Sequence, residues 1–123
     1  MTARTLCDEA LGSMQQDIGA KALVAQALRR TPGRFPTANQ VAAELHMTTR
    51  TLHRKLTRQG TSYQRMLDDI RRTLAIRYLR ETVISVSEIS DRLNYSTPTA
   101  FRQAFRRWMG HAPNVERLKA RGE

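Results

Sequence analysis

The sequence predicts an all-α fold of about seven helices, forming two helix-turn-helix units joined by a long linker helix. Apolar residues recur every three or four positions along most of the chain, and no segment alternates convincingly as a β-strand would. Short clusters of Ser, Thr, Gly and Pro separate these segments. One pattern also occurs twice, as "VAAELHMTTRTLHRKL" (41–56) and "ISDRLNYSTPTAFRQAF" (89–105). Each copy has two apolar residues four places apart, a turn, and a basic amphipathic run.

The N-terminal part predicts a tail followed by one helix. Residues 1–16 show no clear period, and we expect them to form a tail or an interdomain linker. Apolar residues from Ile18 to Leu28 share one face of a first helix, expected over about residues 17–30. The segment "TPGRFP" (31–36) then breaks this helix with two prolines and a glycine.

The first copy of the repeat predicts two short helices. Thr37 and Gln40 have the spacing of a capping box at the start of one helix. Thr48 is placed to cap the second helix, which should stop at Gly60. We therefore expect the first helix-turn-helix subdomain to span residues 17–60.

The segment after Gly60 predicts a long connecting helix. Thr61 and Gln64 repeat the capping-box spacing. The expected connecting element spans residues 61–80, with the helix proper over about 62–80. Its apolar stripe consists of Tyr63, Leu67, Ile70, Leu74 and Tyr78.

The second subdomain is expected over residues 81–123. Ser85 and Glu88 make another capping box, and Ser96 is placed to cap the helix that contains Pro98 in its first turn. Gly110 should end that helix. The helix should carry an inner face of core aromatic residues, and a last short helix should begin near the next proline. The expected aromatic face consists of Phe101, Phe105 and Trp108.

The turn inside each unit needs a residue that accepts a left-handed backbone. Asn94 falls at this position in the second unit and tolerates the conformation well. His46 falls there in the first unit and adopts it less readily.

The charge points to a polyanionic partner. The formal net charge is +10 and the pI is about 11.2. Within residues 1–20, Arg4 stands against Asp8, Glu9 and Asp17, a sum of −2, so the remainder carries +12. Such a charge destabilises a small domain by self-repulsion unless a polyanion neutralises it. Nucleic acid is the first expectation, and an anionic membrane surface is the weaker alternative.

Other chemistries find little support in the composition. The single cysteine, Cys7, allows no disulfide framework and no cysteine-based zinc site within the chain. The three histidines lack ligand spacing, so we expect neither a metal nor another cofactor. No apolar run approaches membrane-spanning length and no signal-peptide core precedes the helices. We therefore expect a cytoplasmic, nucleoid-associated protein.

The second helix of a helix-turn-helix unit enters the DNA major groove, where its outer face meets base edges. Arg can bond guanine, Gln can bond adenine, and Thr can contact the thymine methyl. A solvated basic face is the bland alternative for either helix alone, but the pattern occurs twice. The expected base-contacting residues are Arg50, His53 and Arg54 in the first unit, and Thr99, Arg102 and Gln103 in the second. The expected phosphate-contacting residues are Thr48, Lys55, Arg58, Ser96, Arg106 and Arg107.

Residues 35–117 resemble the DNA-binding domain of the AraC/XylS family of bacterial transcription regulators. The resemblance is carried by "RFPTANQVAAELHMTTRTLHRKLTRQGTSYQRMLDDIRRTLAIRYL" and by "VSEISDRLNYSTPTAFRQAFRRWMGHAP". It implies two helix-turn-helix units on one rigid helix, both facing the same side of DNA, and sequence-specific binding that regulates transcription. Matching positions carry the base-reading role to the six residues named above.

The sequence departs from the family pattern in three places. Asn94 stands where the family usually has Gly, a tolerable change. Ala112 replaces the usual Ser before the last proline, and Glu116 replaces the aromatic residue three places after it. We expect Val115 or Leu118 to take over the packing of the last helix.

The resemblance also bears on partners. Members usually carry a further domain that senses a small molecule or drives dimerisation, and seven helices leave no room for one here. We expect the C-terminal part of a longer regulator, with a stand-alone short member as the alternative. The expected partners are double-stranded DNA at an asymmetric operator and RNA polymerase, with an effector acting only through a domain absent from this chain.

Two rival functions stay open at this point. A non-specific nucleic-acid-binding or chromosome-organising protein shares the charge but does not need unlike polar residues on two reading faces. Some DNA-repair alkyltransferases resemble a fusion of this helix arrangement with a reactive cysteine. Cys7 has no nearby His or Lys to activate it, so we expect no enzyme.

Overall fold

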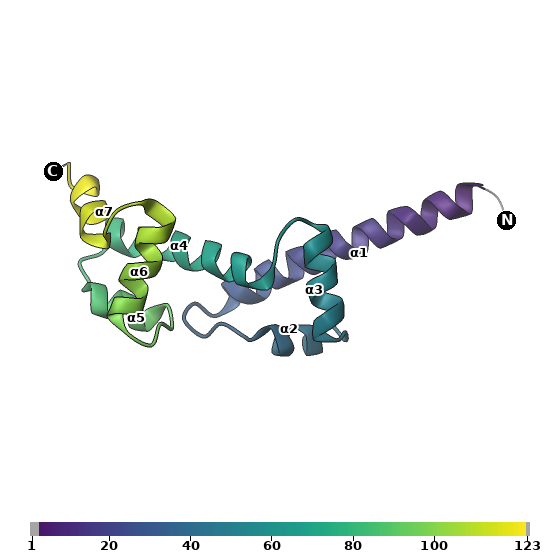
Figure 1. The fold of residues 1–123 in the computed structure, drawn as a ribbon, viewed down its shortest axis with the longest axis horizontal. Coiled ribbons are helices and arrows are strands. Elements are labelled where there is room, and N and C mark those ends of the chain that lie inside the picture. The colour runs from purple at the N-terminus through teal and green to yellow at the C-terminus, as the bar shows by residue number, and fades with distance from the viewer. Residues whose placement is uncertain (1–2, 123) are drawn as a thin grey trace. The chain divides into compact units, whose positions relative to one another are not determined.

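The computed structural model describes the backbone of residues 3–122 and the side chains of residues 17–122, so the side chain of Cys7 lies outside the described part. The backbone described contains seven helices and no strand, which confirms the all-α prediction (Figure 1). The helices are α1 (Ala3–Arg30), α2 (Ala38–Glu44), α3 (Thr49–Arg58), α4 (Tyr63–Glu81), α5 (Val86–Arg92), α6 (Pro98–Met109) and α7 (Pro113–Ala120).

The chain packs as two compact units. Unit 1 comprises residues up to Arg30 together with Pro36–Met66, and unit 2 comprises Thr31–Phe35 together with residues from Leu67 onward. Helix α4 is therefore shared, because its first turn belongs to unit 1 and the rest to unit 2. The sequence predicted a separate connecting element over residues 61–80, but side chains of α4 contribute to both cores.

Helix α1 begins earlier than the sequence indicated. Its backbone is helical from Ala3, whereas we expected a tail over residues 1–16 and a helix from about residue 17. The segment contains no proline, and Gly12 is its one residue with a strongly unfavourable helix propensity, so nothing in it stops the helix from extending. The absence of an apolar period was therefore not a sign of irregular structure.

The core of unit 1 lies between α1, α2 and α3, with α1 and α2 both packing on α3. Tyr63 and Met66 of α4 are buried with it. The Tyr63 hydroxyl donates to the carbonyl of Pro36 and so ties the start of α4 to the segment before α2. The other buried apolar residues of this core are Ala20, Val24, Ala27, Leu28, Val41, Ala42, Leu52 and Leu56.

The core of unit 2 is built around aromatic residues of α6. Phe101 and Phe105 are fully buried, with ring centroids 5.9 Å apart. Trp108 is half-buried and stacks edge-on against Phe105 at 6.4 Å. On α4, the fully buried residues are Ala75 and Leu79. Of the apolar residues predicted to face the core from α4, only Tyr63 is buried and the others are half-buried. In unit 2 the buried positions, Ala75 and Leu79, each follow a predicted one by one residue.

Several of the predicted helix caps are confirmed. Thr37 Oγ1 accepts from the Gln40 amide at 3.1 Å, and Gln40 Oε1 accepts from the Thr37 amide at 2.9 Å, which completes the capping box. Thr48 Oγ1 accepts from the Thr51 amide at 3.1 Å. Gly110 ends α6 in the left-handed conformation, as predicted, with φ of 78°.

Two other caps were assigned to the wrong residue. Helix α4 begins one residue later than expected, and Ser62 Oγ, not Thr61, accepts from the Arg65 amide at 3.1 Å. At α6 the cap is Thr97, whose Oγ1 accepts from the Ala100 amide at 3.1 Å. Pro98 decides this, because the residue before a proline is held in extended backbone, as a cap requires.

Only one of the two hydrogen bonds of the predicted α5 capping box forms. Ser85 Oγ accepts from the Glu88 amide at 3.1 Å. The Glu88 carboxylate instead accepts from Arg92 one turn later, also at 3.1 Å. The cap therefore holds, while its acidic partner stabilises the middle of the helix.

Helix α7 is held by ion pairs to the buried carboxylate of Glu116. Val115 and Leu118 were expected to replace the missing aromatic residue, but they are 40% and 44% exposed. Glu116 itself is buried, and its carboxylate accepts two hydrogen bonds from Arg80, at 2.9 and 2.6 Å. His111 Nε2 lies 2.8 Å from the other carboxylate oxygen.

These ion pairs also explain how α7 does without a cap. Ala112 occupies the N-cap position and makes no side-chain hydrogen bond there. Burial raises the pKa of the Glu116 carboxyl, but the bonds to His111 and Arg80 outweigh burial and hold the pKa below its ordinary value. The charged form of Glu116 is therefore the stable one, and it anchors the first turn of α7 to α4.

Candidate nucleic-acid interface

The two helix pairs α2–α3 and α5–α6 have the same turn geometry. His46 and Asn94 both adopt the left-handed backbone that the sequence predicted, with φ of 58° and 62°. The amide of the next residue donates a hydrogen bond to a carbonyl five residues earlier. These bonds run from Met47 to Ala42 and from Tyr95 to Ser90, both at 3.0 Å. A repeated sequence pattern thus becomes a repeated backbone structure, within each unit separately.

The N-caps give a common origin for comparing residue positions on the two recognition helices. The N-cap of α3 is Thr48 and that of α6 is Thr97, so the second turn is one residue longer than the first. Counted from the caps, the predicted base-contacting residues occupy the second, fifth and sixth helical positions of both helices. In that order they are Arg50, His53 and Arg54 on α3, and Thr99, Arg102 and Gln103 on α6.

Core packing fixes which face these residues occupy. The fourth and eighth helical positions are Leu52 and Leu56 in α3 and Phe101 and Phe105 in α6, and all four are fully buried. With 3.6 residues per turn, the second, fifth and sixth positions then lie on the opposite side of the helix. All six predicted residues are exposed, and none of their side chains makes a hydrogen bond or ion pair with another described residue.

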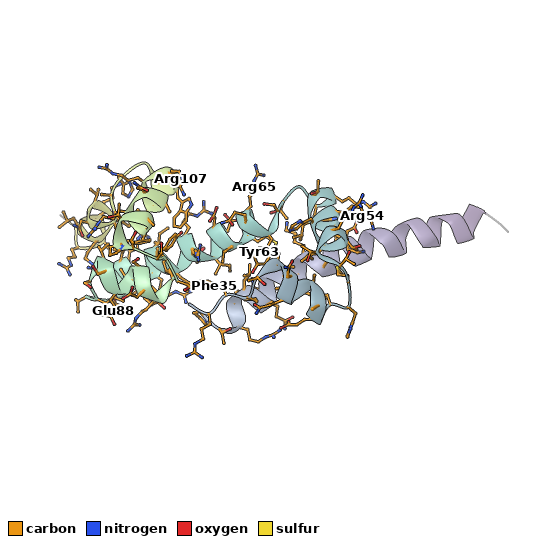
Figure 2. The ribbon with its side chains drawn as sticks, turned by 60° about the horizontal axis from the view of Figure 1, so that its bottom comes forward. Phe35, Arg54, Tyr63, Arg65, Glu88 and Arg107 are labelled. Carbon is orange, nitrogen blue, oxygen red and sulfur yellow. The ribbon has the colours of Figure 1, made fainter. Side chains whose placement is uncertain are left out.

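Most of the predicted phosphate-contacting residues are also exposed. Figure 2 labels one of them, Arg107 on α6, whose side chain lies at the surface of unit 2. Arg106, Arg107 and Ser96 are exposed in unit 2. Thr48 is exposed as well, but its hydroxyl is already bonded to Thr51.

Lys55 differs from the rest of this group. It occupies the seventh position of α3, where α6 has the buried Ala104, and its side chain is 14% exposed. Its Nζ lies 3.5 Å from Oδ1 of Asp17 on α1, and Nη1 of the half-exposed Arg58 lies 3.8 Å from the same oxygen. Lys55 therefore forms an ion pair inside unit 1, which competes with the phosphate contact predicted for it.

Two polar residues that sequence reasoning missed hold the recognition helices in place. Thr49 donates to Oδ1 of Asn39 at 2.5 Å and joins the start of α3 to α2. Ser90 is fully buried in α5, and its hydroxyl donates to the carbonyl of Thr97 at 3.0 Å, at the cap of α6. For Ser90, the sequence signal was its position next to the apolar Ile89 in a helix expected to pack against the core.

The described residues give no sign of other chemistry. Among them, no three His, Cys, Asp or Glu side chains gather closely enough to hold a metal ion. None of the helices in this part of the chain is long and apolar enough to cross a membrane. The exposed faces of α3 and α6, which carry the six free side chains, are the candidate functional surfaces.

Comparison with known proteins places these faces in context. A family model described as a helix-turn-helix domain matches residues 41–118. An HTH-type transcriptional regulator of Mycobacterium tuberculosis is 41% identical over 108 residues, which cover 88% of this chain and 31% of the relative. The ornithine utilization regulator of Pseudomonas aeruginosa is 39% identical over 108 residues, covering 88% of this chain and 32% of the relative. The chain thus spans about a third of the length of these curated relatives.

Solved structures agree with this result. The DNA-binding domain of the global transcriptional factor AdpA, solved in complex with a target DNA, matches with a TM-score of 0.72 and 29% identity. The match covers 84% of this chain and 93% of that domain. The transcriptional regulator CdpR from Pseudomonas aeruginosa matches with a TM-score of 0.67 and 40% identity, covering 70% of this chain and 27% of CdpR.

Proposed function

The chain belongs to the AraC-type helix-turn-helix family of transcription regulators, and we propose that it recognises an asymmetric operator with the exposed faces of α3 and α6. Sequence-specific binding of double-stranded DNA, and regulation of transcription through it, is the function of the family domain. The observation that carries the proposal is that the candidate residues occupy the same positions on both helices, counted from each N-cap. Each presents free, exposed side chains at the same three positions after its cap.

The chemistry of the two faces predicts different target sequences. On α3 the candidates are Arg50, His53 and Arg54, and the arginines suit guanine O6 and N7. On α6, Gln103 suits adenine, and Thr99 and Arg102 suit a thymine methyl and a guanine. Unlike faces cannot recognise the same half-site, so one chain should bind two different boxes. A palindrome is the mark of two identical recognition helices related by a dimer axis.

The expected spacing of the boxes follows from the geometry of DNA. Two recognition helices reach boxes on the same side of the duplex when these lie one helical turn, or a multiple of it, apart. Successive turns of the major groove on one side of DNA recur roughly every 34–36 Å. We therefore propose that the two boxes lie about one helical turn apart.

Exposed cations would supply the sequence-independent part of the affinity. Arg58, Arg106 and Arg107 lie toward the ends of the recognition helices, and the chain carries a net charge of +10. Contacts to phosphates release counterions, so affinity should fall steeply with salt. If about 6–10 phosphates are contacted, the loss between 50 and 200 mM salt should be roughly 10³–10⁵-fold.

Regulation beyond DNA binding is a further part of the proposal. Relatives that share this region are about three times as long. We propose that response to a small-molecule effector belongs to the parts of such regulators outside the shared region. We also propose that bound protein acts on transcription through RNA polymerase. The urease operon transcriptional activator of Escherichia coli, 35% identical over 83 residues, is by its name an activator.

The proposal is tested by selecting bound DNA from a random pool and then altering the selected site. We expect an asymmetric motif bound by one chain, with affinity lost when five base pairs are inserted between its boxes. That insertion turns one box to the far side of the duplex. A symmetric motif bound only by two chains would contradict the proposal, as would indifference to the insertion. Equal competition by random DNA would favour a non-specific nucleic-acid-binding protein.

A further inference from the structure

Arg71, in the middle of α4, contacts the turn of the second helix-turn-helix. Its Nε donates to the carbonyl of Leu93 at 3.0 Å, and its Nη2 donates to the carbonyl of Asn94 at 3.3 Å. Its guanidinium lies 4.4 Å from the centroid of the Tyr95 ring. One side chain therefore contacts three consecutive residues of the turn between α5 and α6.

A second ring packs near the same guanidinium. Phe35, in the segment Thr31–Phe35 that belongs to unit 2, has its ring centroid 5.5 Å from the Arg71 guanidinium carbon (Figure 2 labels Phe35). An arginine between aromatic faces is favoured by cation–π attraction, and burial strengthens that attraction. The side chain of Arg71 is half-buried. Its charge is thus committed within unit 2 and is not free for a phosphate.

The residues that Arg71 holds determine the course of the chain into α6. Asn94 has a φ of 62°, a conformation that residues other than glycine adopt rarely. The Tyr95 amide donates a hydrogen bond to the carbonyl of Ser90, and the Asn94 amide donates one to the carbonyl of Asp91, both at 3.0 Å. The two carbonyls bonded by Arg71 belong to this same stretch of backbone, so the turn is held from both its amide and its carbonyl sides.

We propose that Arg71 is a positioning residue for DNA recognition. From α4 it fixes the α5–α6 turn, and thereby the angle at which α6 presents Arg102 and Gln103. Arg71 touches no base in this scheme and acts only through α6. The inference rests on the proposed function, because it takes α6 as the helix that recognises the second box.

The first experiment measures the turn without DNA. Hydrogen exchange of the Asn94 and Tyr95 amides is compared in wild type, Arg71→Ala and Arg71→Lys. Loss of two hydrogen bonds from a charged donor should speed exchange of these amides by at least about tenfold. Lysine keeps the charge but cannot bridge both carbonyls with the geometry of a guanidinium, so it should resemble alanine. Exchange of the Phe105 amide, in the centre of α6, should stay slow and show that the unit is folded.

Arg77 provides a matched control on the same helix. It is exposed and makes no hydrogen bond, ion pair or cation–π contact with another described residue, so Arg77→Ala removes the same charge without touching the turn. Exchange of the turn amides in Arg77→Ala should equal that of wild type. Unchanged exchange in both Arg71 variants would overturn the inference.

The second experiment measures binding to three duplexes: the selected site, the site with its first box scrambled, and the site with its second box scrambled. Wild type should lose affinity with either scrambled duplex, and failure of this arm would count against the proposed function itself. Arg71→Ala should bind the intact site at least about tenfold more weakly. Scrambling the second box should then weaken binding by Arg71→Ala no further. Scrambling the first box should weaken binding by Arg71→Ala as much as it weakens binding by wild type.

The lysine variant separates positioning from simple charge. If Arg71→Lys binds the intact site like wild type, the charge alone matters and the positioning role is wrong. The same conclusion follows if Arg71→Ala weakens discrimination at both boxes equally. A selective loss at the second box, shared by the lysine and alanine variants, supports the inference.

Discussion

Replacing Lys55 with methionine should destabilise unit 1 and change DNA binding little. The change keeps the length and packing of the side chain but removes its charge. Asp17, whose side chain is 7% exposed, would then face only the half-exposed Arg58 at 3.8 Å. Removing one partner of a buried ion pair typically costs about 3–5 kcal/mol. Because Arg58 remains and the Lys55–Asp17 separation is 3.5 Å, we expect a smaller loss of about 1–3 kcal/mol.

Urea denaturation at neutral pH and low salt measures this loss as a lower midpoint at unchanged slope. Arg54→Met is the matched control, because Arg54 lies on the same helix, is exposed, and has no described partner. It should change the free energy of unfolding by less than about 0.5 kcal/mol. Asp17→Asn combined with Lys55→Met should recover part of the loss, with a coupling energy of about 0.5–3 kcal/mol.

The salt dependence of DNA binding decides between the two roles of Lys55. A phosphate contact contributes about 0.9 to the slope of log affinity against log salt. We expect Lys55→Met to leave that slope unchanged. If the variant unfolds like wild type and its slope falls by about one, Lys55 contacts phosphate as the sequence first indicated, and the ion pair with Asp17 is unimportant.

Three further predictions concern the stability of unit 2. Thr97→Ala should lower the free energy of unfolding by about 1 kcal/mol through loss of the α6 cap, while Ser96→Ala changes it by less than about 0.5 kcal/mol; a larger effect of Ser96 in urea denaturation would reverse the cap assignment. Gly33→Ala should lower the thermal midpoint more than Gly60→Ala, because both have positive φ but only at Gly33 would a Cβ meet a backbone oxygen, at 2.2 Å; equal shifts would refute this. The depressed pKa of Glu116 means that its stabilisation is complete above the ordinary value of about 4.3 and is lost as pH falls through the lower folded value. Unfolding followed by fluorescence of the single tryptophan should show this acid dependence, and Glu116→Gln should flatten it.

Local signals in the sequence were enough to predict the architecture. Thr37, Gln40 and Thr48 are caps whose partners lie within three residues, so spacing alone identifies them. Asn94 and His46 were placed at the turns because the repeat has a fixed distance from apolar pair to turn. The recognition faces followed from the same local periodicity, since the buried positions of a short helix determine its exposed ones.

The remaining errors involve choices that local pattern cannot make. Ser96 and Thr97 are adjacent hydroxyl residues, and only the backbone restriction before Pro98 selects the second. Lys55 looks like any other cation in a basic run, and its partner Asp17 lies 38 positions away in the sequence. Glu116 was read as a defect in packing because nothing nearby in the sequence shows that Arg80 would reach it.

The central claim is that one chain recognises two different boxes, one with α3 and one with α6. The most direct test compares the DNA motifs selected by wild type, Arg54→Ala and Arg102→Ala. Each variant should relax preference at one base position, at a cost of about 1–3 kcal/mol, and the two positions should fall in different boxes. If both variants select the wild-type motif unchanged, or both alter the same box, these residues do not read DNA as proposed.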